Sequence, residues 1–151
     1  MKDFKDINEI LDFAIQNEQQ AADFYEKLSN EADGKTMRDT FAQFAEEEKG
    51  HKVRLLKIKE DGKYEAKQED ILDMKISDYL VSAKTSGKMT YQEALILAMK
   101  REKAAFKLYT KLAEIAPTEE FVNLFMSLAN EEAKHKMNFE IEYDDIIYKE
   151  N

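Results

Sequence analysis

Four stretches of the chain repeat apolar residues in steps of three and four, the spacing of one helical face, with a carboxylate near the middle of each face. In chain order, the carboxylates are Glu18, Glu48, Glu102 and Glu132. Burying a carboxylate on an apolar face is costly unless it is paired or binds a metal. No Lys or Arg lies on these faces. A pair of divalent cations would supply the missing positive charge.

Local signals predict where the helices begin and end. Asp6 with Glu9 and Thr90 with Glu93 have the spacing of capping boxes. Asp33–Gly34 offers a left-handed turn to close the first helix, and the second stops at Asp61–Gly62. Helices are therefore predicted over about 6–32, 36–60, 90–116 and from 118 almost to the C-terminus.

The segment 62–89 has a weaker pattern. Ile76, Leu80 and Ala83 indicate a short helix within it. Because a long connection in a compact domain usually has a role, we expect a crossover that travels the length of a bundle.

The second half of the chain repeats the first at an offset of 84 residues, without a gap. Glu102 falls on Glu18 and Glu132 on Glu48. The repeat predicts an all-α four-helix bundle of two helical hairpins related by a pseudo-twofold axis. We expect a single domain over 1–151, with hairpins at 6–60 and 90–148 and the crossover at 61–89.

Composition narrows the classes of partner and compartment. The net charge of −9 argues against nucleic acid and anionic membranes as partners. No apolar run approaches the length of a membrane span, and the first residues lack the apolar core of a signal peptide. A cytoplasmic protein is the expectation. None of the 151 residues is Cys, which excludes disulfides, thiol catalysis and Fe–S clusters on these residues.

His51 and His135, the only histidines, each follow a carboxylate by one helical turn. In both Glu-x-x-His pairs one side chain can bridge two metals while the other binds one. Carboxylates with a little imidazole suit Fe or Mn better than a structural zinc site. The repeat gives the two histidines equivalent roles.

One Glu from each of two helices, with Glu-x-x-His from each of the other two, resembles the di-iron carboxylate pattern of ferritin-like bundles. The chain is most similar to the rubrerythrin branch and also resembles the ferroxidase centre of bacterioferritin. The resemblance implies two iron ions, with Mn or Zn as substitutes. It implies the iron ligands Glu18, Glu48, His51, Glu102, Glu132 and His135. It also makes Tyr25 and Tyr109 catalytic candidates that hydrogen-bond ligand carboxylates.

Three departures refine this resemblance. Rubrerythrins carry an extra carboxylate where this chain has Ala105, and they usually end in a Cys-rich rubredoxin domain. Bacterioferritins have a haem-binding Met where this chain has Lys49, so no haem is expected. The chain therefore resembles an erythrin-type rubrerythrin without the rubredoxin domain.

Simpler interpretations compete at several positions. Tyr25 and Tyr109 have the spacing of ordinary core residues, and Glu47 and Glu131 are predicted to be surface charges.

Three functions stay open. The first is a peroxide-reducing or dioxygen-reducing oxidoreductase with a role in oxidative stress, served by a separate electron donor such as a rubredoxin. The second is iron handling by ferroxidase-like oxidation, and the third is a non-enzymatic metal-binding bundle. We expect a homodimer, with hairpins either kept within one chain or exchanged between two.

Overall fold

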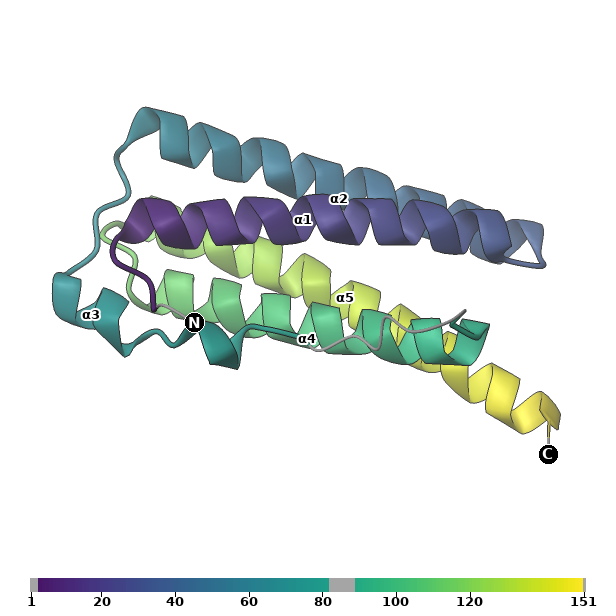
Figure 1. Cartoon of the computed structure of the whole chain (residues 1–151). Helices are drawn as coiled ribbons and strands as arrows, with labels where there is room; N and C mark the ends of the chain where they lie inside the picture. The colour runs from purple at the N-terminus through teal and green to yellow at the C-terminus, as the bar shows by residue number, and fades with distance from the viewer. Residues whose placement is uncertain (1–2, 82–88, 151) are drawn as a thin grey trace.

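The computed structural model of the chain describes residues 3–81 and 89–150. Four long helices form its body: α1 (Ile7–Glu31), α2 (Lys35–Asp61), α4 (Tyr91–Glu114) and α5 (Glu119–Glu150). The pairs α1/α2 and α4/α5 are antiparallel hairpins that lie side by side (Figure 1). The described residues form no strand, and none of their helices is long and apolar enough to cross a membrane. The prediction of an all-α, ferritin-like four-helix bundle is confirmed.

The two predicted N-terminal caps are present. The Asp6 side chain accepts a hydrogen bond from the Glu9 backbone N–H at 2.9 Å. Thr90 and Glu93 make both hydrogen bonds of a capping box. These bonds satisfy backbone donors that the first helical turn leaves unpaired, which fixes where α1 and α4 begin.

One of the two predicted C-terminal turns is wrong. Gly62 ends α2 in the left-handed conformation, with a φ of 65°. At the end of α1, however, Ala32 is extended, and Gly34 has a φ of −108° and is the N-cap of α2. The connection is so short that Gly34 begins the next helix instead of closing the previous one.

The crossover also differs from its prediction. It contains α3 (Gln68–Asp73) and a single 3₁₀ turn, η1 (Ile76–Asp78), where an α-helix reaching Ala83 was predicted. The buried residues Ile71 and Met74 anchor the segment earlier than expected, while Ala83 lies outside the described residues. Figure 1 shows that α2 ends and α4 begins at opposite ends of the bundle, so the connection covers its length as predicted.

The buried apolar side chains form two clusters rather than one. The first includes Leu11, Leu55, Leu112 and Phe125, and the second includes Tyr25, Phe41, Leu95 and Phe139. The repeat pairs Leu11 with Leu95 and Phe41 with Phe125, so each pair has one member in each cluster. The pseudo-twofold axis therefore crosses the bundle between the clusters, at the height of the buried carboxylates.

Candidate metal centre

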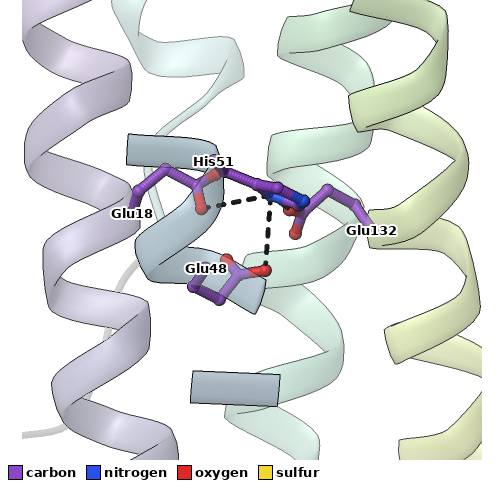
Figure 2. A group of neighbouring side chains, drawn as sticks. All are labelled: Glu18, Glu48, His51 and Glu132. Atoms are coloured by element: carbon purple, nitrogen blue, oxygen red, sulfur yellow. Dashed lines mark ion pairs between the residues drawn. The ribbon is translucent and has the colours of Figure 1, made fainter. Parts of the chain in front are cut away.

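The structure brings all six predicted ligand residues together. Glu18 comes from α1, Glu102 from α4, Glu48 and His51 from α2, and Glu132 and His135 from α5. No residue of this set is more than 2% exposed. Figure 2 shows His51 with the carboxylates of Glu18, Glu48 and Glu132, which reach it from three helices. One chain supplies the whole set.

The donor atoms form two overlapping groups, each with its ligand atoms within 4.8 Å of one another. One group contains Glu18 and His51, and the other contains Glu102 and His135. Glu48 and Glu132 belong to both. Two shared carboxylates between two terminal Glu–His pairs is an arrangement that can hold two metal ions, with the shared pair between them.

The site also has polar atoms without partners. Among the described residues, all the buried side-chain atoms that lack a hydrogen bond belong to this set, except Thr110 Oγ1. At the site they are Glu18 Oε2, Glu48 Oε1, His51 Nδ1, Glu102 Oε2, both Glu132 oxygens and His135 Nδ1. Buried polar atoms are rarely left unpaired in native proteins. Carboxylate oxygens and imidazole nitrogens are metal-binding atoms, so the residues present fit two cations.

The contact between His51 and Glu132 also indicates a site for a cation. His51 Nδ1 lies 2.6 Å from Glu132 Oε1 without hydrogen-bond geometry. The other ring nitrogen, Nε2, lies 3.0 Å from Glu131 Oε2, and a carboxylate there can only accept. In a neutral His51 ring the proton is therefore on Nε2, and Nδ1 is an acceptor that faces the Glu132 oxygen, itself an acceptor. Two acceptors this close repel each other unless a proton or a cation lies between them.

Glu47 and Glu131 are not plain surface charges, and that prediction is wrong. Glu131 faces His51 Nε2, and Glu47 Oε2 lies 2.5 Å from His135 Nε2. Their side chains are only 36% and 32% exposed, respectively. Each one immediately precedes a candidate ligand and reaches across to the histidine of the other hairpin. The repeat, which pairs Glu47 with Glu131, was the signal that could have identified them.

The two histidine–glutamate pairs differ in one respect. Arg54 Nη1 lies 3.3 Å from Glu131 Oε2, so this carboxylate serves both a histidine and an arginine. The repeat places Asn138 opposite Arg54, and its amide donates to the Lys134 carbonyl instead. Within residues 3–81 and 89–150, Glu47 has no arginine partner comparable to Arg54, so its carboxylate interacts with His135 alone. The positions of the six ligand residues are close to twofold symmetric, but the charged residues around them are not.

Tyr25 and Tyr109 lie against the ligand carboxylates and not only in the core. The Tyr25 hydroxyl donates to Glu102 Oε1, and the Tyr109 hydroxyl donates to Glu18 Oε1. Burial, followed by the charge of nearby carboxylates, raises the pKa of both hydroxyls well above the usual 10.0. Both therefore keep their protons at ordinary pH and act as donors. Each bond joins α1 to α4, and thus one hairpin to the other.

Without a metal, protons balance the charge of the site. Burial, and then the charge of the neighbouring carboxylates, raises the pKa of Glu48 and Glu132 well above their usual value. Burial alone would lower the pKa of His135, but the close, negatively charged carboxylates of Glu102 and Glu48 raise it to about 11. Burial would raise the pKa of Glu102, but its close neighbours Glu132 and His135 lower it.

Known proteins resemble this chain in both fold and sequence. Among solved structures, the chain is similar to one from Thermotoga maritima that is described as a candidate ferritin-like diiron-carboxylate protein. The TM-score is 0.76, with 22% identity over 95% of this chain and 98% of the other. At this identity the likeness shows the fold. Among curated proteins, none matches the chain. A family model described as Rubrerythrin matches residues 9–143. Because that match covers most of the sequence, the chain belongs to the rubrerythrin family.

Proposed function

We propose that this protein is a non-haem di-iron oxidoreductase that reduces hydrogen peroxide with electrons from a separate donor. The observation that carries the proposal is the set of six buried Glu and His side chains whose unpaired atoms form two overlapping groups. Two iron ions held there would supply together the two electrons that, with two protons, convert peroxide to two waters. Manganese or zinc could occupy the same donor set.

Each residue has a defined part in this proposal. Glu48 and Glu132 would hold both ions, while Glu18 with His51 and Glu102 with His135 would hold one each. Glu47 and Glu131 orient the imidazoles so that Nδ1 faces the carboxylates. Tyr25 and Tyr109 keep protonated hydroxyls on Glu102 and Glu18, which fixes those carboxylates and holds a proton beside the centre.

The electron donor is proposed to be a different protein. A rubredoxin-type centre needs cysteine ligands, and the 151 residues contain none. A homodimer and a cytoplasmic setting are further proposals.

The test compares two oxidants. Protein loaded anaerobically with two Fe(II) per chain is mixed in a stopped-flow instrument with peroxide or with dioxygen at equal concentration. We expect a larger second-order rate constant for peroxide. Glu48→Gln should impair iron loading, whereas Glu46→Gln, at an exposed position on the same helix, should not.

Iron handling is the second candidate, and Ala105 favours it. The resemblance to rubrerythrins implies an extra carboxylate at this position, and the side chain of alanine has no atom that could bind iron. Faster oxidation by dioxygen, with ferric product accumulating beyond two irons per chain, would replace the peroxidase proposal with this one.

A further inference from the structure

A cavity of about 110 Å³ lies beside the metal centre, between α1 and α4. The carboxylates of Glu18, Glu48, Glu102 and Glu132 form its inner wall, while neither histidine lines it. Ala21 and Ala105 flank the carboxylates, and the repeat pairs these two alanines. The cavity therefore lies on the pseudo-twofold axis, on the side of the centre opposite the imidazoles.

The other approaches to the centre are filled by side chains. On the α2/α5 side, the contacts of His51 with Glu131 and of His135 with Glu47 close the surface. Along the bundle, the ring of Phe44 lies 4.2 Å from that of His135 between centroids. At the opposite end Tyr109 packs against Phe125, with 6.2 Å between ring centroids. Entry from any of these directions would require buried side chains to move.

The cavity has a roof made by the crossover. Tyr79, Leu80 and Val81, directly after η1, line its outer side. Tyr79 is 8% exposed and its backbone N–H bonds to the Ile76 carbonyl at 2.9 Å, so this part of the roof is fixed. Leu80 is 42% exposed and so extends from the cavity to the solvent. Its side chain therefore lies where a molecule would enter.

We propose that this cavity is the entry port of the metal centre and that Leu80 restricts the size of what passes. The port follows from the cavity alone, whereas the size restriction on oxidants rests on the proposed function. At about 110 Å³ the cavity is smaller than the roughly 150 Å³ that holds one benzene ring in a protein interior. Hydrogen peroxide fits, whereas a hydroperoxide with an aromatic ring does not.

The port is tested without turnover. The full chain is loaded with Co²⁺, and azide binding is followed by visible absorption. Ala105→Leu fills the cavity and should slow azide association about tenfold or more, because tenfold is the lower end of what a single methylene group changes in a pocket. Val81→Phe obstructs the cavity from the roof, outside the bundle, and should act in the same direction. Unchanged azide kinetics in a Co²⁺-loaded Val81→Phe variant would overturn the port.

The size restriction is tested on iron-loaded protein with hydrogen peroxide and cumene hydroperoxide. Leu80→Ala should raise the rate for cumene hydroperoxide relative to that for hydrogen peroxide by roughly tenfold. Leu56→Ala is the matched control, because Leu56 on α2 is 43% exposed and does not line the cavity. An equal ratio in the two variants would overturn the role of Leu80. If azide responds as expected but neither hydroperoxide oxidises the centre, the port stands and the proposed function fails.

Discussion

At the scale of single residues, the sequence predicted the six side chains that converge but not the two that orient the histidines. The six lie on apolar helical faces, where a charge stands out as an exception. Glu47 and Glu131 lie one position away from those faces, where charges are common. Whether such a position meets solvent or a neighbouring helix depends on how α2 and α5 are rotated against each other. Periodicity within one helix does not contain that information.

Replacing these two glutamates should weaken metal binding unequally. Mutating the carboxylate that hydrogen-bonds a metal-binding histidine typically costs about 10–100-fold in metal affinity. We expect Glu47→Gln to show this loss of affinity. Glu131→Gln should show a smaller loss, because the Glu131 carboxylate already interacts with Arg54 as well as with His51. Competition between protein and a chelator for Co²⁺ measures both. Glu46→Gln, next to Glu47 but exposed, is the control, and equal affinities for the Glu46 and Glu47 variants would contradict the claim.

At the scale of elements, the four long helices followed from local pattern because helical periodicity and capping are local properties. The crossover did not. Its short helix forms where Ile71 and Met74 find buried places against the bundle, and a weak pattern cannot indicate which of several apolar residues will be buried. The internal repeat predicted how the helices are arranged. Two equivalent hairpins with buried charges at matching positions can bring those charges together when they pack face to face.

Tyr25 and Tyr109 connect the two hairpins, so replacing either one should lower both the stability of the fold and its affinity for metal. Tyr25→Phe leaves Glu102 Oε1 without its donor and removes a bond between α1 and α4. A hydrogen bond to a charged group contributes about 1.5–3 kcal/mol to stability. We expect a loss of this order for the metal-free protein in urea unfolding, together with weaker Co²⁺ binding.

Tyr64→Phe is the matched control for that prediction. The Tyr64 hydroxyl donates to the Leu112 carbonyl at 2.5 Å, away from the carboxylates. This variant should lose stability but keep its metal affinity. If Tyr25→Phe and Tyr64→Phe bind Co²⁺ equally well, the tyrosine at the centre has only a structural role.

At the scale of the whole molecule, the bundle places a layer of converging acidic groups between two apolar clusters. The clusters favour burial of this layer, while the carboxylates oppose it unless cations or protons neutralise them. Folding and metal binding are therefore linked. Any ion that binds the folded chain better than the unfolded one stabilises the fold.

The same linkage predicts how the metal-free protein responds to pH. The folded chain holds protons more tightly than the unfolded chain at Glu48, Glu132 and His135, because all three pKa values are raised on folding. Above their ordinary pKa values the folded state therefore binds more protons, so its stability falls as pH rises. The lowered pKa of Glu102 adds no slope between about pH 6 and pH 8, since this group is ionised there in both states.

We therefore expect the melting temperature of the metal-free protein to rise on acidification from about pH 8 to about pH 6. A stability change of about 1 kcal/mol moves the melting temperature by about 2–4 °C at this chain length, so circular dichroism can detect the effect. The metal-loaded protein should melt higher and vary less over the same range, because bound cations replace the protons that the site otherwise retains. A metal-free melting temperature that stays constant or falls on acidification would mean that repulsion among the four buried carboxylates does not destabilise the metal-free fold.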